Sequence, residues 1–313
     1  MLELDDRWIW DFWHVLDGGT HHLFFLSAPR SLGDPDLRHW NVAIGHATSP
    51  DLRDWTVHDD VLGPGEAGAF DDRTTWTGSV VRDGGGGWVM AYTGTSSVED
   101  AKVQRIGIAR SDDLFTWNRQ TDGVLAVDSG HYEQLDPEVW FDEAWRDPWL
   151  FRHDGRWHCF VTARANEGAP RDRGVIGHAV SDDLRSWEVL PPVSAPMGLG
   201  QLEVPQLCNI GGHWQLVFCS DTDTQSDAAR RDLPGTGTYH LVGDGPLGPF
   251  HGPPHPIEAG PDPTTYAGRV VEGTDGRHWL LTWERTDAAG AFVGRIGPPR
   301  ELRADPTGRL HLV

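Results

Sequence analysis

Short runs of aromatic and β-branched residues recur along the chain, each bounded by Gly, Asp or another turn-forming residue. Such runs are typical of β-strands, because these side chains pack well on a pleated, half-buried surface. Five of them open in the same way, with a Trp or His after a turn, at residues 22–25, 88–92, 157–161, 214–218 and 279–283. They lie about 60 residues apart, and a fixed period of this length indicates a repeat architecture.

A second repeat accompanies the first. A motif that contains a Ser/Asp cluster, then Leu, and a closing Trp occurs at residues 47–55, 109–117 and 179–187. Ser and Asp side chains bond to their own backbone in turns, and the Leu and Trp can pack back on a sheet. We assign the motif to the connection between the third and fourth strands of each unit, with residues 245–250 taking its place in the fourth unit. Radial repetition of four-stranded sheets predicts an all-β fold, a five-bladed β-propeller.

The composition agrees with one all-β domain. The chain has 313 residues, more than a usual single domain, but its repeats run from end to end without a Ser/Gly/Pro-rich linker. Its 38 Gly and 22 Pro residues supply many turns, and no segment shows the 3.6-residue periodicity of a helical core. We therefore predict that residues 1–313 form a single catalytic propeller with few, short helices.

The charge narrows the classes of partner. The chain carries 47 acidic against 26 basic residues, a formal net charge of −21, which repels nucleic acid and anionic membrane surfaces. A small neutral ligand fits better, and most of the acids are interpreted as a solubilising surface. No apolar stretch reaches the length of a membrane span, and the first ten residues lack the features of a secretory signal. We expect a cytoplasmic protein, and the sequence does not indicate its oligomeric state.

No metal or other cofactor is predicted. The three cysteines, Cys159, Cys208 and Cys219, lie in predicted strands without metal-binding spacing. With a turn at Gly211-Gly212, Cys208 faces about Gln215, so a bridge to Cys219 is disfavoured. The segment 221–227 alternates oxygen-bearing residues like a calcium loop, but it lacks the Gly and the Glu that such a loop requires.

Candidate chemistry appears when the hairpins are aligned on their second strands. Counting back about 11 residues from the start of each second strand reaches one position per unit, occupied by Asp11, Thr77, Asp147, Glu203 and Ala267. The first strand of each propeller blade lines the central channel, so these positions should face a common axis. Each acid taken singly also fits a turn or a solvated loop. Taken together, the three carboxylates should repel one another and differ in pKa, which is what glycosidic cleavage needs from its ionised and protonated groups.

Four motifs carry a resemblance to known glycoside hydrolases. Trp10-Asp11-Phe12-Trp13 resembles the nucleophile motif of the levansucrase-type enzymes, glycoside hydrolase family 68. Trp76-Thr77-Gly78-Ser79 is similar to the Trp-Ser-Gly-Ser motif of that family and to the Phe-Ser-Gly-Ser motif of the invertase family 32, although Thr stands at position 77. Arg146-Asp147-Pro148 matches the Arg-Asp-Pro motif that both share, and Glu203-Val204-Pro205 resembles their acid motif. The order of the motifs is kept across nearly the whole chain.

The resemblance implies a five-bladed propeller that acts on β-fructofuranosides, such as sucrose or fructo-oligosaccharides, with retention of configuration. It implies that Asp11 is the nucleophile, that Glu203 is the acid and then the base, and that Asp147 stabilises the transition state. The two reacting carboxyl groups of a retaining enzyme lie about 5 to 5.5 Å apart. The candidate substrate contacts are Trp10, Trp13, Trp76, Thr77, Ser79 and Arg146.

Two other interpretations stay open. The first is an inverting arabinofuranosidase or xylosidase similar to glycoside hydrolase family 43, with carboxyl groups about 6.5 to 9.5 Å apart. The second is a non-catalytic sugar-binding propeller, in which ligand contacts should repeat from blade to blade. The Arg-Asp-Pro motif and the Trp-rich first motif favour the fructosidase. The sequence leaves open whether water or another sugar accepts the fructosyl group, which linkage and chain length are preferred, and whether a structural calcium binds.

Overall fold

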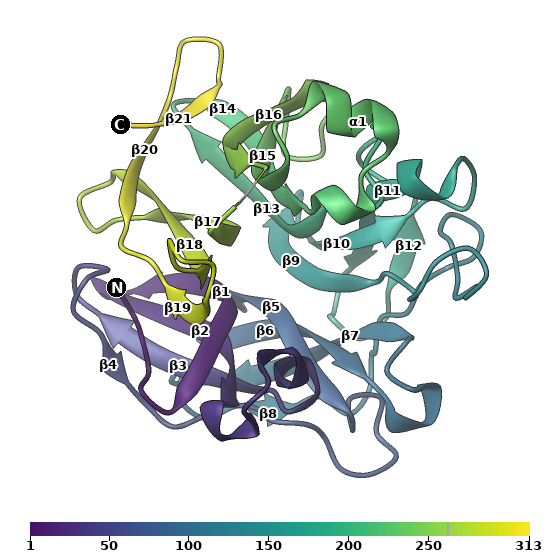
Figure 1. The fold of residues 1–313 in the computed structure, drawn as a ribbon. Helices are drawn as coiled ribbons and strands as arrows, with labels where there is room; N and C mark the ends of the chain where they lie inside the picture. The colour runs from purple at the N-terminus through teal and green to yellow at the C-terminus, as the bar shows by residue number, and fades with distance from the viewer. Residues whose placement is uncertain (262) are drawn as a thin grey trace.

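The computed structural model describes residues 1–261 and 263–313 and confirms the predicted all-β, five-bladed propeller. Five antiparallel sheets are arranged around a central axis, and the chain passes through them in sequence order (Figure 1). In each sheet the strand that comes first in the sequence lies innermost. This is the arrangement expected when successive hairpins with one apolar pattern pack side by side and share their buried faces.

Each blade has four strands in consecutive order, and the fifth blade has one more. Blade 1 consists of β1 (Arg7–Asp17), β2 (Thr20–Pro29), β3 (Ala43–Ser49) and β4 (Thr56–Val57). Blade 2 consists of β5 (Thr74–Arg82), β6 (Trp88–Thr95), β7 (Gln104–Ser111) and β8 (Asn118–Arg119). Blade 3 consists of β9 (Arg146–His153), β10 (Arg156–Arg164), β11 (Gly174–Ser181) and β12 (Glu188–Leu190).

Blade 4 consists of β13 (Glu203–Ile210), β14 (His213–Ser220), β15 (Thr236–Gly243) and β16 (Phe250–Gly260). Blade 5 consists of β17 (Thr265–Glu272), β18 (His278–Thr286), β20 (Arg300–Ala304) and β21 (Leu310–Leu312), and β19 (Phe292–Ile296) also pairs with β18.

Helices are few and short, as predicted. The α-helix of the described residues, α1 (Asp227–Asp232), follows a 3₁₀ turn, η5 (Thr222–Thr224). The remaining 3₁₀ turns are η1 (Arg30–Leu32), η2 (Pro35–Trp40), η3 (Ser97–Glu99) and η4 (Pro170–Asp172). Among the described residues, no helix is long and apolar enough to cross a membrane.

The repeated Ser/Asp motif joins the third and fourth strands of blades 1, 2 and 3, which confirms its predicted place. In blade 2, Asp113 Oδ1 accepts hydrogen bonds from the backbone N–H groups of Phe115 and Thr116, at 2.8 and 2.7 Å. The Leu of each motif is buried and has a positive φ between 60° and 69°. A side chain in this left-handed region costs energy unless packing holds it there, so burial of Leu114 and its counterparts fixes the turn.

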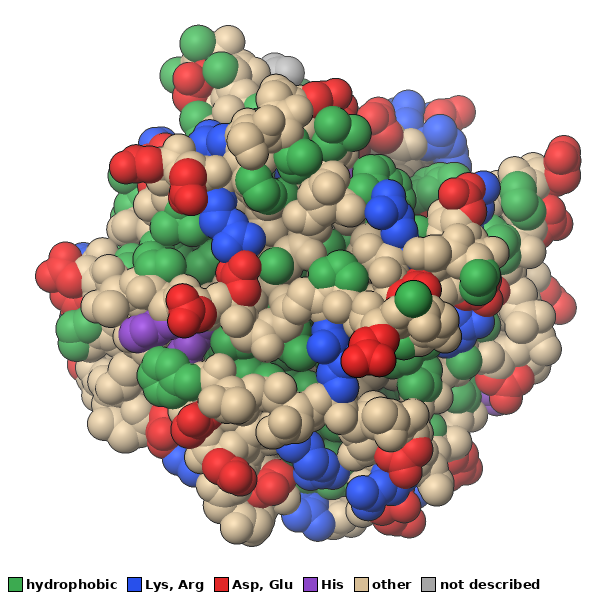
Figure 2. Space-filling view, turned by 90° about the horizontal axis from the view of Figure 1, so that it is seen from below, with side chains coloured by type: hydrophobic (Ala, Val, Ile, Leu, Met, Phe, Trp, Pro, Cys, Tyr) green, Lys and Arg blue, Asp and Glu red, His purple; other side chains and the backbone are tan. Residues whose placement is uncertain are grey.

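The hydrophobic core lies between neighbouring blades. The largest apolar cluster joins blades 1, 2 and 5 and includes Val204 and Cys219 of blade 4. Smaller clusters join blades 2 and 3, blades 3 and 4, and blades 4 and 5. Cys159 and Cys219 are buried, all three thiols are free, and Cys208 pairs with Gln215 across the hairpin as predicted. Acidic side chains are spread over the face seen in Figure 2 with basic ones among them, in keeping with a solubilising surface.

The ring closes where the N-terminal segment meets blade 5. Leu2 and Ile296 exchange backbone hydrogen bonds of 2.9 Å in both directions. The Arg30 guanidinium donates to the carbonyl of Val293 at 2.9 Å, also in the last blade. These bonds join the start of the chain to β19 and complete the circle (Figure 1).

Candidate active site

A cavity of about 820 Å³ opens where the innermost strands of the five blades converge. All five blades supply side chains to its wall. The titratable and hydroxyl-bearing residues of this wall are Asp11, Arg38, His39, Arg73, Thr77, Asp100, Lys102, Asp142, Arg146, Asp147, Glu203, Asp221, Tyr266 and Arg285. The three predicted acids therefore meet in one cavity, whose volume is large enough for a small ligand.

A β-bulge near the start of each innermost strand turns the backbone at the cavity. The pairing of β1 with β2 shifts between Ile9 and Phe12, so Asp11 lies within the bulge of blade 1. The corresponding shifts in β9, β13 and β17 directly follow Arg146, Glu203 and Tyr266. Bulges re-aim side chains, which explains how the acids reach the cavity from strands that are otherwise regular.

This register corrects the alignment made from the sequence. Glu203 occupies the position of Arg146 in blade 3, and the counterpart of Asp147 in blade 4 is Val204. The residue after each of these positions, Asp147, Val204 and Ala267, has a φ of 56°, 47° and 49°. Arg146 and Glu203 each lie 11 residues before the Trp of the second strand, Trp157 or Trp214, whereas Asp147 lies 10 residues before it. A count of about 11 residues does not distinguish adjacent positions, so the alignment paired Asp147 with Glu203.

Asp11 accepts a hydrogen bond from the hydroxyl of Thr77, with 2.9 Å between Thr77 Oγ1 and Asp11 Oδ2. Burial, together with the charges of Asp147 and Glu203, raises the pKa of Asp11 to about 6, while the Thr77 bond and the Arg269 charge oppose the rise. The carboxyl is therefore ionised at neutral pH but takes up a proton in mildly acidic solution.

Asp147 is buried and held through a single oxygen. Its Oδ2 accepts from the Thr162 hydroxyl at 2.9 Å and from the backbone N–H of Val204 at 3.1 Å. The Arg146 Nε lies 3.6 Å from the same oxygen. Burial raises the pKa of Asp147 and the Arg146 charge opposes this rise. The carboxylate is thereby fixed in orientation, with its second oxygen outside these contacts.

Glu203 is held at both oxygens. Arg146 Nη2 lies 2.5 Å from Oε1, and the Tyr266 hydroxyl donates to Oε2 at 2.5 Å. Burial and the Glu203 charge raise the pKa of Tyr266 well above its ordinary value, so the phenol keeps its proton and remains a donor. Two donors on one carboxyl fix its position at the cavity.

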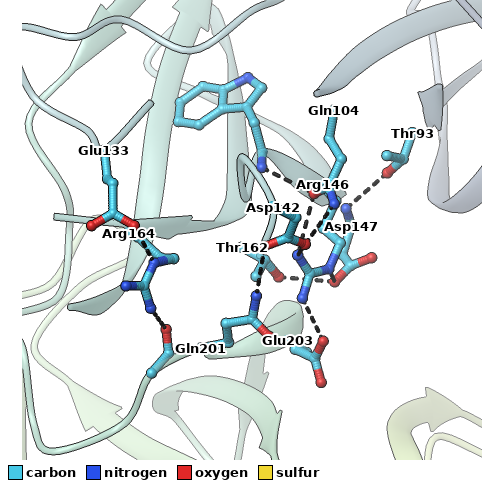
Figure 3. A network of polar contacts seen from close by, with 12 residues as sticks. Thr93, Gln104, Glu133, Asp142, Arg146, Asp147, Thr162, Arg164, Gln201 and Glu203 are labelled. Carbon is cyan, nitrogen blue, oxygen red and sulfur yellow. Dashed lines mark hydrogen bonds and ion pairs between the residues drawn. The ribbon is translucent and has the colours of Figure 1, made fainter. Parts of the chain in front are cut away.

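Arg146 links the acids of blades 3 and 4 (Figure 3). Its Nη1 contacts Asp142 Oδ2 and Gln104 Oε1, each at 3.2 Å. Burial alone lowers the pKa of Arg146, but the charges of Asp142, Glu203 and Asp147 outweigh burial and raise it, so the guanidinium stays charged. This cation compensates a concentration of negative charge that would otherwise be costly to bury.

The structure separates the predicted substrate contacts into two groups. Trp10, Trp76, Thr77 and Arg146 line the cavity. Two others lie outside this wall: the ring of Trp13 stacks on Phe24 in the core, and Ser79 Oγ accepts a hydrogen bond from the backbone N–H of Leu150 in the next blade. Residues two apart in a regular strand share a face, but a bulge between them breaks this alternation. Bulges precede both Trp13 and Ser79, so these side chains do not share the face of Asp11 and Thr77.

Much of the cavity wall was not found from the sequence, including Gln104, Asp142, Tyr266 and Arg38. Tyr266 had a usable signal, since it directly precedes Ala267 at the aligned position of the fifth unit. Arg38 had none. Its guanidinium lies 5.7 Å from the ring of Trp10 and 5.5 Å from that of Trp283, a cation–π arrangement built from opposite ends of the chain.

Comparisons with known proteins show the family of the chain. Residues 13–304 match the model of the glycosyl hydrolases family 32 N-terminal domain, a match that begins just after Asp11. The sucrose-6-phosphate hydrolase of Klebsiella pneumoniae is 26% identical over 285 residues, which cover 85% of this chain and 53% of the relative. The raffinose invertase of Escherichia coli is 28% identical over 310 residues, which cover 93% of this chain and 59% of the relative. The chain thus spans little more than half the length of these curated relatives.

One solved structure shows how far the fold is shared. The inulosucrase of Halalkalicoccus jeotgali bound to kestose superposes with a TM-score of 0.79 and 20% identity, over 99% of this chain and 87% of that protein. At this level of identity the likeness concerns the fold alone.

Proposed function

The chain belongs to glycosyl hydrolase family 32, of which it carries the N-terminal domain, and we propose that it is a retaining glycoside hydrolase acting on β-fructofuranosides. The observation that carries the proposal is the meeting of Asp11, Asp147 and Glu203 in one cavity, with Arg146 between the last two. Sucrose and fructo-oligosaccharides are the proposed substrates. The single catalytic domain and the cytoplasmic location remain predictions.

In the first step, the Asp11 carboxylate attacks the anomeric carbon of the fructosyl unit. The bond between that carbon and the glycosidic oxygen breaks, and the departing oxygen takes a proton from the Glu203 carboxyl. A covalent fructosyl ester on Asp11 results. The Thr77 hydroxyl, 2.9 Å from Asp11 Oδ2, orients the attacking carboxylate.

In the second step, Glu203 removes a proton from a water molecule or from a sugar hydroxyl. The activated oxygen attacks the anomeric carbon, and the bond to Asp11 breaks. Arg146 and Tyr266 contact the two Glu203 oxygens and stabilise the carboxylate present between the steps. Asp147, held through Oδ2, accepts hydrogen bonds from hydroxyl groups of the fructosyl unit, and these bonds strengthen as positive charge develops on the ring.

Product analysis tests the substrate class. The protein is incubated with sucrose, a fructan, sucrose-6-phosphate and aryl arabinofuranosides, and released fructose and arabinose are separated by chromatography. Sucrose-6-phosphate belongs in this series because a relative is named for it, and because Arg73, Lys102 and Arg285 lie in the cavity wall. Fructose release supports the proposal. Arabinose release alone would replace it with a family 43-like activity, and sugar binding without turnover would favour a sugar-binding propeller.

A substitution at Glu203 tests the roles. Glu203→Gln keeps the shape of the side chain and removes its proton transfer, which should lower kcat on sucrose about 10²- to 10⁴-fold. Glu167→Gln, in an exposed loop, is the matched control and should keep the parent rate. Methanolysis followed by NMR distinguishes the stereochemistry: methyl β-fructofuranoside indicates retention, and the α-anomer would exclude the double displacement.

A further inference from the structure

Arg269 lies on β17 beneath the catalytic cavity, with only 2% of its surface exposed. Its Nε donates to the carbonyl of Phe12 at 3.2 Å. Its Nη1 donates to the carbonyls of Val204 and Pro205 at 2.9 and 2.8 Å. One guanidinium from blade 5 thus binds backbone oxygens of blade 1 and blade 4.

These carbonyls belong to the segments that carry the proposed reacting carboxyls. Phe12 directly follows Asp11, and Val204 directly follows Glu203. Val204 is β-branched and has a φ of 47°, a conformation that persists only where the surroundings hold it. Its N–H is bonded to Asp147 Oδ2 and its carbonyl to Arg269, so both of its backbone polar groups are fixed.

Arg269 also places a positive charge close to the proposed catalytic carboxylates. The groups that act on Arg269 are the carboxylates of Asp147 and Asp11 and the thiol of Cys219, and Glu203 lies on the neighbouring β13. Burial lowers the pKa of Arg269 while Asp147, Cys219 and Asp11 raise it, and an arginine keeps its charge in such surroundings. Arg146 already contacts Glu203 and Asp147 on the cavity side, whereas Asp11 makes no ion pair with a described residue within 4 Å. Two other arginines therefore supply positive charge to Asp11: Arg38 from the cavity wall and Arg269 from β17.

We propose that Arg269 is a positioning residue of the fructosyl-transfer site, which fixes the bulges that carry Asp11 and Glu203 and supplies the buried positive charge that favours ionised Asp11. This inference rests on the proposed function for its kinetic readout. Blade 5 has Ala267 at the position aligned with the acids of the other blades, and Arg269 is its contribution to the site.

Three variants test the two parts of the proposal. Arg269→Gln removes the charge, and Arg269→Lys keeps the charge but loses the planar group that binds two blades at once. The matched control is Arg164→Gln. Arg164 is equally buried, with 1% exposed, and also binds backbone carbonyls, those of Gly200 and Pro170, but it pairs with Glu133 and not with the proposed catalytic acids.

The first readout is the pH dependence of kcat/KM on sucrose. Arg269→Gln should move the acid limb of the profile upward by about one pH unit, because an opposite charge near a carboxyl shifts its titration by that order. Arg269→Lys should leave the limb in place and lower kcat about tenfold through misplacement of the carboxyls. Arg164→Gln should lower Tm without moving the limb.

The second readout needs no turnover. The Asp11 carboxyl is followed by NMR titration of the protein labelled with ¹³C at its Asp carboxyls, with Asp11→Asn identifying the resonance. If the parent hydrolyses no fructoside, the proposed function fails, and the shift of the Asp11 midpoint in Arg269→Gln still tests the charge. An unchanged midpoint in Arg269→Gln, or an equal shift in Arg164→Gln, would overturn that part. If Arg269→Gln does not fold, Arg269→Lys decides alone, and unchanged kcat in it would overturn the positioning role.

Discussion

The Asp11 carboxyl should cost stability at neutral pH, and the cost can be worked out from its surroundings. Its pKa is raised from the ordinary 3.8 to about 6, chiefly by burial. The difference is about 2 pH units, and each unit corresponds to about 1.4 kcal/mol, so ionising Asp11 in the folded protein costs about 3 kcal/mol relative to the unfolded chain. Because the carboxyl faces an open cavity, this is an upper figure. Asp11→Asn removes the charge and keeps an oxygen for the Thr77 hydroxyl, so it should stabilise the protein while abolishing turnover.

The pH dependence gives the sharper test. A folded-state pKa above the unfolded value means that stability is lost as pH rises from about 3.8 to about 6, and is constant above that. The stability gained by Asp11→Asn should therefore be near zero at pH 3.8, about 1.5 kcal/mol at pH 5 and about 3 kcal/mol at pH 7. Urea unfolding at these three pH values, analysed as the difference between variant and parent, measures it, with the exposed Asp182→Asn as control. A gain that did not change with pH, or a loss at pH 7, would refute the reasoning.

Three further predictions concern other parts of the molecule. Thr77→Val removes the donor to Asp11 and should lower kcat/KM on sucrose about tenfold while moving the acid limb upward, whereas Thr77→Ser should restore the parent profile. Burial lowers the pKa of His46 to about 3, so the neutral imidazole stabilises the fold above pH 6.5 and this stabilisation is lost as the pH falls. In His46→Gln the urea midpoint should therefore fall less between pH 7 and pH 5 than in the parent protein, and an equal fall in both proteins would contradict this. Gly78→Ala would place a Cβ 2.3 Å from the carbonyl oxygen of Ala91 and should lower Tm by several degrees in thermal unfolding. An unchanged Tm would show that the two strands move apart at this point without loss of stability.

The fold could be predicted from the sequence because each blade of a propeller repeats the same sequence pattern. The second strands that begin at Trp88, Trp157, Trp214 and Trp279 each carry the same apolar pattern, and the Ser/Asp motif marks the same turn three times. Repetition averages out the ambiguity that a single short apolar run has. The family and the residues of its motifs followed from the same order.

The details of the site could not be predicted in the same way. Trp13 and Ser79 were expected at the sugar, but the bulge between Ile9 and Phe12 and the contact with Leu150 place them in packing roles. The partners of Glu203 come from blades 3 and 5, 57 residues before it and 63 residues after it. No local pattern encodes such pairs, because they depend on the register at which whole blades meet.

The joining of the first and last blades determines when the cavity is completed during synthesis. Asp11 lies near the start of the chain, while Tyr266 and Arg269 lie in the last blade, so the cavity that they share is complete only when the first and last blades have joined. A ribosome releases blade 1 long before blade 5. The nascent protein therefore holds Asp11 without Arg269 and Glu203 without Tyr266, and the cavity is complete only when the last sheet has docked.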